Sequence, residues 1–484
     1  MTDQLQSLPQ VAGPVVENVV NFKSPQDPAN PKNWSSQKKI YTSTIVAYTT
    51  FVSSWGSAIL SPGLAEISEL FHVSAEDANL VTSLFVLGFA AGPLVWAPFS
   101  ERKGRRIPLS IATFGYALFT IAVASANDIQ TVLICRFWAG AFASAPLALI
   151  GAFVSDMFDF AQRGTAVAIL SIMVFLGPIM SPVVGAFIVD SYLEWRWTEY
   201  LTAIMAFVAL VLQIVFLDET YAPALLASNA NKLRLETKNM SFYATHELEA
   251  VTFNSLLDRN INRPLRLLFG EVILFLVCLY MAFVYGLLYS LLLSYPFVFV
   301  EKRGWALGVG TLPYLGVGFG MILGCISVIA FQPWINRRTV KNNNIPVPEN
   351  RLPLAILGAV IFTIGLFWFA WGGNQNSTPW IVPTLGGLPI GFGFITIFLS
   401  LLNYIVDTYL IYAASAIAAN TFLRSLVGAV FPLFTTQMYE RLGVGWGGSL
   451  LGFIALGMVP IPVLFYIFGR RLREKSPWAS TGKK

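Results

Sequence analysis

The sequence predicts an all-α membrane protein in which twelve transmembrane helices form two six-helix bundles. Three observations support this prediction. Of the 484 residues, 55% are hydrophobic and only 12% are charged, about half the charged share of soluble domains. Apolar runs of about 20 residues, the length that spans a bilayer, recur along the chain. The basic residues gather on one side of the resulting layout.

The first six apolar runs define an N-terminal bundle over residues 40–217. We place its spans at residues 40–62, 78–99, 107–125, 130–154, 165–189 and 196–217. Residues 1–39 are polar and contain several prolines, without the basic-then-apolar layout of a signal peptide. We expect them to form a disordered cytoplasmic tail.

A polar cytoplasmic linker, predicted at residues 218–269, separates this half from a C-terminal bundle over residues 270–469. The six spans of the second half are placed at residues 270–294, 308–330, 352–371, 380–402, 412–438 and 447–469. Residues 470–484 form a second cytoplasmic tail. Two halves of six spans around a charged linker are typical of carriers whose bundles rock about a central cavity.

The distribution of positive charge supports this topology. With the N-terminus in the cytoplasm, the cytoplasmic tails and loops hold 25 of the 31 Lys and Arg residues, and the external loops hold four. Basic residues favour the cytoplasmic side of a membrane, and a missed or additional helix would scramble the bias. The remaining two, Arg136 and Arg424, fall inside spans.

Composition also excludes several function classes. The pI is near 9, but basic residues in a membrane protein set its orientation, so we expect no nucleic-acid partner. Two histidines and three cysteines, all three within apolar runs, provide no sequence-local metal cluster. We therefore expect no metal, no cofactor, no disulfide framework and no enzymatic activity.

The loop between the second and third spans concentrates charge in the sequence APFSERKGRR, residues 97–106. Carboxylates and guanidinium groups at helix ends form pairs of modest energy, which can break and re-form during a conformational change. We predict a cytoplasmic gate in this loop and the next, made of Glu101, Gly104, Arg105, Arg106, Asp156 and Arg163. Simple positive-inside anchoring is the better interpretation for Arg102 or Lys103 alone.

Two cations lie inside predicted spans. A charge there costs at least about 2.5–3.5 kcal/mol unless it faces a polar interior. Arg136 should therefore point into a cavity or a hydrogen-bonded network, or else snorkel to the outer interface. Arg424 lies near the middle of its span and needs carbonyls, hydroxyls or a carboxylate as partners. Asp407 is one candidate partner.

The fifth span contains the sequence LGPIMSPVVG, residues 176–185. Two prolines four residues apart remove backbone donors and bend a helix, and glycines permit close contact with a neighbouring helix. The residues that provide these properties are Gly177, Pro178, Pro182 and Gly185.

Aromatic residues in the spans indicate the type of substrate. Tyr285 and Tyr289 are four residues apart and share a helix face. Aromatic walls with few charges suit amphipathic, partly planar molecules and organic cations, although interfacial belts and core packing are the alternative explanation. The candidate substrate contacts are Tyr48, Tyr285, Tyr289 and Asn403.

Together these stretches resemble fungal members of the major facilitator superfamily, in the twelve-span drug:H⁺ antiporter group that includes cycloheximide-resistance, polyamine and toxin exporters. The resemblance extends from NPKNW at residues 30–34 to Arg470. In the 97–106 loop, Ala97 and Glu101 replace the glycine and aspartate of the superfamily signature. The other similar stretches are CRFWAG at 135–140, the 176–185 run, DETYAP at 218–223, and residues 402–407 with 413–416 and 424–425.

This resemblance implies the superfamily fold and an alternating-access exporter of an amphipathic small molecule, exchanging it for protons in the plasma membrane. We expect a lipid-embedded monomer, with Arg136, Asp407 and Arg424 in the cavity or in proton coupling. The alternatives are a facilitator or polyamine-type transporter of the same fold, an integral-membrane enzyme, and a receptor that transports nothing.

Proton exchange requires a buried carboxylate that takes up and releases a proton. Four carboxylates near span ends qualify. We rank Asp156 and Asp407 first, followed by Glu199 and Glu271. If none of them titrates during transport, the protein is a facilitator driven by the substrate gradient alone.

Overall fold

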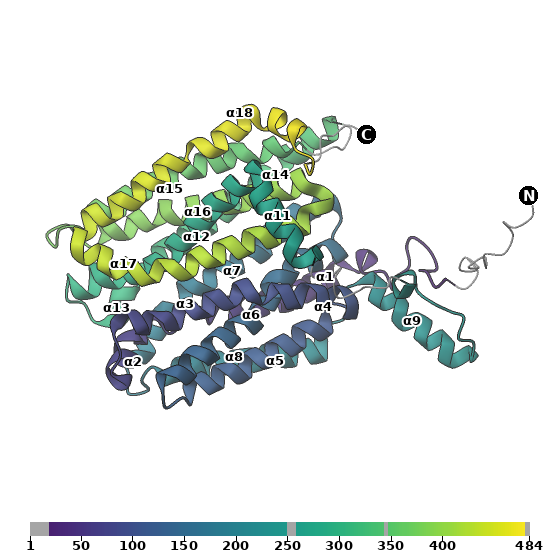
Figure 1. The fold of residues 1–484 in the computed structure, drawn as a ribbon, viewed down its shortest axis with the longest axis horizontal. Coiled ribbons are helices and arrows are strands. Elements are labelled where there is room, and N and C mark those ends of the chain that lie inside the picture. The colour runs from purple at the N-terminus through teal and green to yellow at the C-terminus, as the bar shows by residue number, and fades with distance from the viewer. Residues whose placement is uncertain (1–18, 249–257, 343–346, 480–484) are drawn as a thin grey trace, which may run out of the picture.

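The computed structural model describes residues 19–248, 258–342 and 347–479, and these are almost entirely helical (Figure 1). The described stretches nearest the two termini, before α1 and after α18, and the linker helix α9 lie at the same side of the molecule (Figure 1). We call this the linker side and the opposite end the distal side. An even number of crossings places both ends together, as the sequence predicts.

The N-terminal bundle is built from residues 36–216. Its spanning helices are α1 (Ser36–Trp55), α3 (Ala75–Ala91) with α4 (Pro93–Lys103), α5 (Arg106–Ala124), α6 (Ile129–Met157), α7 (Phe160–Val189) and α8 (Arg196–Phe216). The second span divides into α3 and α4 at Gly92, directly before Pro93, which has no N–H to donate. Helix α1 ends at Trp55, and the short distal helices η3 (Ser61–Gly63) and α2 (Leu64–Phe71) follow it.

The C-terminal bundle repeats this plan. Its spanning helices are α12 (Val272–Pro296), α14 (Tyr314–Lys341), α15 (Leu352–Gly372), α16 (Ile381–Tyr409), α17 (Ala413–Met458) and α18 (Pro460–Lys475). Helix α17 contains the eleventh span and the beginning of the twelfth, because Gly443 breaks it with φ 72° and ψ 169°. The twelfth span continues into α18.

Short elements connect the spans. At the linker side they are η2 (Pro31–Asn33), α9 (Ala222–Thr237), η4 (Thr245–Leu248), η5 (Asp258–Asn262), α11 (Arg263–Gly270), η7 (Pro348–Arg351) and η8 (Leu410–Tyr412). At the distal side they are η6 (Phe297–Glu301) and α13 (Leu307–Thr311). The described part of the N-terminal tail contacts the linker, because the Val20 N–H donates to the Tyr243 carbonyl at 2.9 Å. The rest of that tail, residues 1–18, lies outside the described residues, as do 249–257 of the linker and 480–484 of the C-terminal tail.

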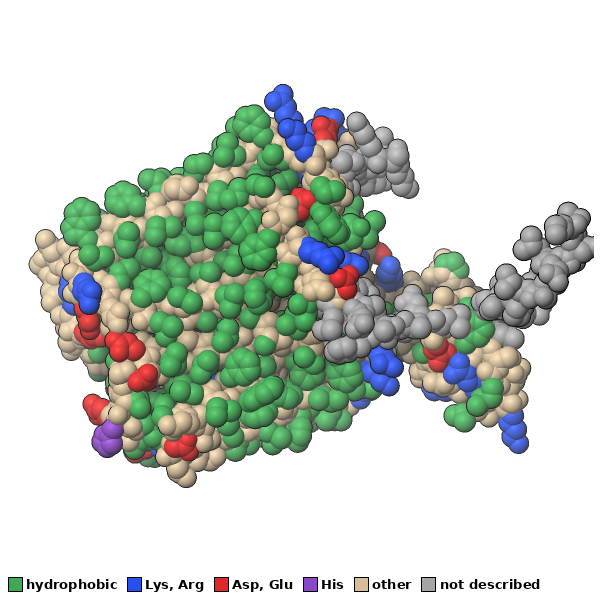
Figure 2. All heavy atoms as spheres, in the orientation of Figure 1, with side chains coloured by type: hydrophobic (Ala, Val, Ile, Leu, Met, Phe, Trp, Pro, Cys, Tyr) green, Lys and Arg blue, Asp and Glu red, His purple; other side chains and the backbone are tan. Residues whose placement is uncertain are grey.

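The outer surface fits a lipid environment. On the face shown in Figure 2, hydrophobic side chains cover the middle of the molecule and charged side chains gather at its two ends. Nine helical stretches of the described chain are long and apolar enough to span a bilayer. The last, Ile381–Lys475, joins α16, α17 and α18 and includes three spans. Helix α1, whose serines and threonines lower its hydropathy, completes the twelve-helix fold.

Glycines set the distance between helices of the same bundle. A Cβ at Gly140 of α6 would lie 2.0 Å from the Phe85 carbonyl oxygen of α3, and one at Gly88 would lie 2.4 Å from the Phe137 oxygen of α6. In the other bundle, a Cβ at Gly320 of α14 would lie 2.1 Å from the Leu388 oxygen of α16. These glycines provide close packing within each bundle, where lipid offers no hydrophobic drive for association.

Hydrogen bonds between the bundles are few among the described residues, and most of them lie at the distal side. Among the described residues, N–H and O–H hydrogen bonds join Tyr289 to Ser57 (3.1 Å), Gln437 to Glu76 (2.6 Å), Asn79 to the Pro432 carbonyl (3.5 Å), and the Gly308 N–H to Asp190 (2.8 Å). Closer to the linker side, the Cys325 thiol lies 3.6 Å from the Ala168 carbonyl oxygen. In this conformation the bundles are therefore tied together mainly at the distal side.

Replacing Gly140 by valine tests the close packing of α3 against α6. We expect Gly140→Val to lower the thermal midpoint in detergent micelles, since overpacking of a close contact costs about 1–3 kcal/mol. The control is Gly457→Val, also in a helix but with no atom within 4 Å of its Cβ position. Equal midpoints for the two variants would contradict this account.

Candidate functional site

The most deeply buried ion pair lies inside the N-terminal bundle. Arg136 of α6 donates from Nη1 to Oε1 of Glu199 of α8 at 3.1 Å, and the two side chains are 1% and 0% exposed. Arg136 Nε also donates to the Val81 carbonyl of α3 at 3.1 Å. The guanidinium carbon lies 4.3 Å from the ring centre of Phe85. Arg136 is thus held inside the bundle and does not snorkel to the interface.

This pair is incompletely satisfied. Neither Nη2 of Arg136 nor Oε2 of Glu199 has a hydrogen-bond partner among the described residues. Tyr116 of α5 and Tyr289 of α12 lie close enough to act on Arg136 electrostatically. Of the four carboxylates that the sequence ranks, Glu199 is the most buried, although the ranking places it in the second pair. The proximity of Arg136 to Tyr289 connects the pair to the other bundle.

A second cluster occupies the linker side of the same bundle. Arg105 donates from Nε to Asp156 at 3.1 Å and from Nη1 to the Ser100 hydroxyl at 2.8 Å. The guanidinium carbon of Arg105 lies 4.3 Å from the ring centre of Tyr221, at the start of the linker. The Thr220 hydroxyl donates to the same Asp156 oxygen at 3.4 Å. Asp156 is therefore bound to the 97–106 loop, as the sequence predicts.

Glu219, which follows Asp218 at the start of the linker, holds the backbone of the 97–106 loop. Its two oxygens accept the backbone N–H groups of Arg105 at 2.8 Å and Arg106 at 3.1 Å. Gly104 has φ +84°, and a Cβ there would lie 2.4 Å from Glu219 Oε2. Only glycine fits this position without strain.

The other predicted gate residues lie nearby but do not all join the cluster. Glu101 is in the last turn of α4, and the Arg106 side chain donates to the Ile214 carbonyl of α8. Arg163 of α7 forms no ion pair with a described residue, and its buried Nε has no hydrogen-bond partner there. The contacts of Arg105, Arg106, Asp156 and Glu219 described above stay within the N-terminal bundle and the beginning of the linker.

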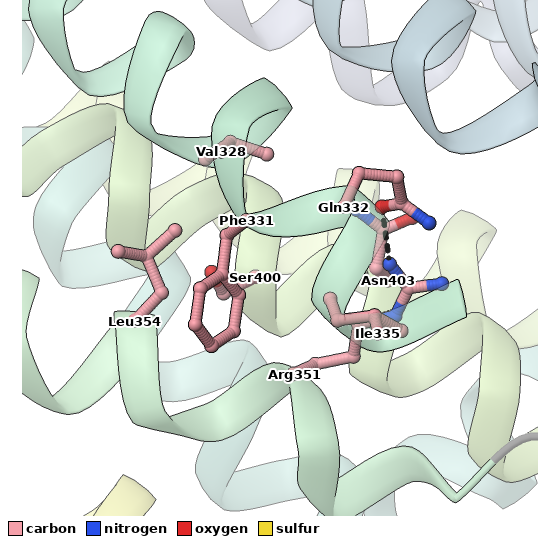
Figure 3. A pocket seen from close by; sticks show the side chains of 8 residues that line it. All are labelled: Val328, Phe331, Gln332, Ile335, Arg351, Leu354, Ser400 and Asn403. Carbon is pink, nitrogen blue, oxygen red and sulfur yellow. Dashed lines mark hydrogen bonds between the residues drawn. The ribbon is translucent and has the colours of Figure 1, made fainter. Parts of the chain in front are cut away.

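The candidate pairing of Asp407 with Arg424 is wrong. Asp407, near the end of α16, instead accepts a hydrogen bond from Arg351 Nε at 2.9 Å. Arg351 Nη1 donates to Gln332 Oε1 at 2.8 Å, and Figure 3 shows these two side chains. Arg351 lies in η7, which follows α14 and precedes α15. The partner of Asp407 is therefore an arginine of the connecting segment before α15, and not Arg424.

Asn403 belongs to this linker-side cluster of the C-terminal bundle. It lines a small cavity together with Gln332, Arg351 and Ser400 (Figure 3), and its side chain donates to the Leu399 carbonyl at 2.8 Å. The cavity measures about 10 Å³, room for about one water molecule. An organic substrate does not fit there.

A second ion pair closes the same end of the C-terminal bundle. Arg473 of α18 donates from Nε and Nη2 to the two oxygens of Glu349, at 2.9 and 2.8 Å. Both side chains are buried. Two parallel charge-assisted bonds of this kind also fix the relative orientation of the groups. These bonds attach helix α18 to the turn before α15.

Arg424 is buried at the contact between the bundles. It lies near the middle of the eleventh span with 9% of its surface exposed, and its guanidinium carbon lies 5.1 Å from the ring centre of Tyr285 and 5.3 Å from that of Phe398. The Tyr285 hydroxyl is 3.3 Å from that of Tyr289, which donates to Ser57 of the other bundle. The structure thus brings three predicted residues together: Arg424, Tyr285 and Tyr289.

The remaining sequence candidates lie in two further places. Tyr48 of α1 is half-buried and donates to the Met205 carbonyl of α8 at 3.4 Å, within its own bundle. The 176–185 run lies in the middle of α7, where a Cβ at Gly177 would lie 2.3 Å from Ser54 Oγ and one at Gly185 would lie 2.4 Å from the Ile59 oxygen. Pro178 and Pro182 lie inside α7 between these glycines.

Acidic residues collect at the distal side. Burial is the largest cause that raises the pKa of Glu66 above its ordinary value, and the Trp195 N–H, which donates to Oε2 at 3.1 Å, acts in the opposite direction. Three neighbouring carboxylates add to the rise: Glu194, Glu69 and Asp190. The pKa shift of Glu66 means that it keeps its proton to a higher pH than a solvated glutamate.

Sequence reasoning missed several of these contacts. Glu219 was visible only as part of the linker run, and Arg351 and Glu349 only as loop charges. Gln332, which binds Arg351, is a polar residue within an apolar run, and this is the one local signal that the sequence offers for the contact. The pairing of Glu199 with Arg136 had no local signal, because the two residues are 63 positions apart.

Comparison with known proteins agrees with this architecture. The family model described as Major Facilitator Superfamily matches residues 46–432. An uncharacterised MFS-type transporter of Schizosaccharomyces pombe is 47% identical over 476 residues, 98% of this chain and 92% of that protein. The major facilitator superfamily multidrug transporter FLU1 of Candida albicans is 43% identical over 463 residues, 95% of this chain and 76% of that protein.

A solved structure shares the fold. The proton:xylose symporter XylE, bound to 6-bromo-6-deoxy-D-glucose, superimposes with a TM-score of 0.65 at 17% identity, covering 90% of this chain and 96% of that one. At this identity the likeness concerns the fold alone. With the family model, the fungal relatives and the twelve helices in two bundles in agreement, the chain belongs to the major facilitator superfamily and is a membrane transporter, not an enzyme.

Proposed function

We propose that this transporter exports an amphipathic small molecule from the cytoplasm in exchange for protons, by alternating access between its two bundles. It works as a monomer in the plasma membrane with both ends in the cytoplasm. The excess of basic residues at the linker side supports this orientation. The multidrug name of the FLU1 relative supports export of organic molecules.

The observation that carries the proton part of the proposal is the Arg136–Glu199 pair. Both groups are buried, and each retains a polar atom without a partner among the described residues. A proton arriving on Glu199 would neutralise the carboxylate and release the Arg136 guanidinium. Intramembrane carboxylates of this kind are typical of proton relays in transporters. Glu199 therefore replaces Asp156 and Asp407 as our first candidate for the coupling group.

Tyr289 provides a physical connection between this pair and the substrate region. It lies within electrostatic range of Arg136, and its hydroxyl contacts both Tyr285 and Ser57. A change of charge at Glu199 alters the field at a hydrogen bond that holds the bundles together. We propose that protonation thereby biases the equilibrium between the two conformations.

The linker-side clusters serve as the gate. In the present conformation Arg105 and Arg351 each bind a carboxylate of their own bundle, and the bundles are tied at the distal side. The opposite conformation requires that the distal hydrogen bonds break and that the bundles repack at the linker side, where Gly164 of α7 already lies against Gln332 of α14. The charged helix ends around Arg105 and Arg351 would then supply the new contacts between the bundles.

Export and proton coupling are tested in two steps. In cells lacking the gene, we expect at least one amphipathic metabolite to accumulate inside and to decrease in the medium. In proteoliposomes, a protonophore should abolish concentrative transport of that metabolite. Unchanged metabolite pools would contradict export. Transport that is insensitive to the protonophore would identify a facilitator and contradict proton exchange.

Glu199→Gln tests the coupling group. The amide keeps the size of the carboxylate and a hydrogen bond to Arg136 but cannot ionise, so we expect concentrative transport to disappear while exchange down the substrate gradient remains. Glu236→Gln, an exposed residue of α9, is the control and should transport like the wild type. Retained proton-driven accumulation in Glu199→Gln would exclude this residue as the coupling group.

Gly104→Ala tests the loop held by Glu219. The control is Gly304→Ala, because Gly304 also has a positive φ, +69°, but no atom within 4 Å of its Cβ position. A non-glycine residue held at a sparsely populated positive φ costs of order 1–3 kcal/mol. We expect both variants to lose thermal stability and Gly104→Ala to lose more, with slower transport. Equal losses in stability and transport would show that the Glu219 contact is unimportant.

A further inference from the structure

We infer that Arg424 is the binding group for an anionic part of the substrate, so that the transported molecules include amphipathic organic acids. This inference rests on the proposed export function and specifies its substrate class. It goes beyond the sequence expectation, in which aromatic walls favour amphipathic molecules and organic cations.

Arg424 differs from the other buried arginines in having no counter-ion among the described residues. Four arginines of the described chain are buried to a similar or greater extent, and each forms an ion pair with a carboxylate: Arg105 with Asp156, Arg136 with Glu199, Arg351 with Asp407, and Arg473 with Glu349. No described carboxylate pairs with Arg424, and its Nε is buried without a hydrogen-bond partner.

The surroundings of Arg424 orient its charge without neutralising it. The rings of Tyr285 and Phe398 lie within cation–π distance of the guanidinium. The groups that act on it electrostatically are the hydroxyls of Tyr285 and Tyr289, which are uncharged at neutral pH. A buried cation in lipid without a partner is unfavourable. A ligand that brings its own negative charge removes this penalty.

The chemistry of the site favours a planar acid attached to an apolar body. The guanidinium is a rigid fork of donors that matches a carboxylate bidentately. The ring faces of Tyr285 and Phe398 offer contact to an aromatic or apolar skeleton. A carboxylate, or an acidic phenol or enol of similar shape, therefore fits better than a sugar or a polyamine.

The position of Arg424 suits a transported ligand. Phe398 of α16 contacts Phe175 of α7 with ring centres 4.7 Å apart, so the aromatic contacts of Arg424 continue into the N-terminal bundle. One turn along α17, a Cβ at Gly428 would lie 3.0 Å from Tyr285 and 3.3 Å from Val86 of α3. A ligand bound to Arg424 thus lies where the two bundles meet, and its contacts change when they move.

The test uses a matched pair of probes and the full-length protein in nanodiscs. Radiolabelled 1-naphthaleneacetate carries the negative charge, and 1-naphthaleneacetamide is its uncharged counterpart. We expect the wild type to bind the acid about tenfold more tightly than the amide, and Arg424→Gln to bind the two equally. The control is Arg441→Gln, an exposed distal residue, which should keep the preference. Equal affinities in the wild type, or a preserved preference in Arg424→Gln, would overturn the inference.

Two further measurements keep the result unambiguous. If Arg424→Gln does not fold, Arg424→Lys retains the charge without the planar fork and should keep a reduced preference for the acid; an undiminished one would count against the bidentate contact. Competition with chloride and inorganic phosphate distinguishes a site for organic acids from a site for inorganic anions. Displacement of the bound acid by either inorganic anion at equal concentration would assign the site to an inorganic anion. Export of an uncharged metabolite together with no acid preference would defeat this inference alone, whereas unchanged metabolite pools in the deletion strain would defeat the export function.

Discussion

The structure depends on the absence of water from the hydrocarbon core of the membrane. Without water, every backbone N–H and C=O must bond within the protein, which permits helices and excludes open strands and irregular segments facing lipid. The same constraint applies to charge. Four of the five buried arginines in the described chain therefore hold carboxylates brought from another helix or connecting segment. Arg424 departs from this rule at the place where the two bundles meet.

Contacts within and between the bundles differ in kind. Within a bundle, glycines bring helix backbones together at Gly88, Gly140 and Gly320, and buried ion pairs join the ends of helices. Between the bundles, the described chain provides aromatic contacts and a few hydrogen bonds, two of which end on the distal carboxylates Glu76 and Asp190. Moving one bundle against the other therefore breaks few hydrogen bonds, while each bundle remains intact.

The two proposed chemical roles lie in different halves. Glu199, the proposed proton carrier, is held by Arg136 in the N-terminal bundle, and Arg424, the proposed anchor of the substrate, belongs to the C-terminal bundle. Tyr289 lies between them, within electrostatic range of both arginines and hydrogen-bonded to Ser57. Separate sites joined by one bistable contact allow proton and substrate to act on the same conformational equilibrium without competing for one group.

The sequence by itself determined the membrane class, the twelve helices and the charge-rich linker side, because the length and composition of an apolar run act locally. It also identified Arg136, Arg424 and the Gly104 loop, since charges in spans and a glycine among arginines stand out in any context. Only the tertiary structure decided the partners. Asp407 binds Arg351, 56 residues away, and Glu199 binds Arg136, because ion pairing depends on which helix ends the fold brings within a few ångströms. No local pattern encodes that proximity, nor the fact that no carboxylate of the described chain pairs with Arg424.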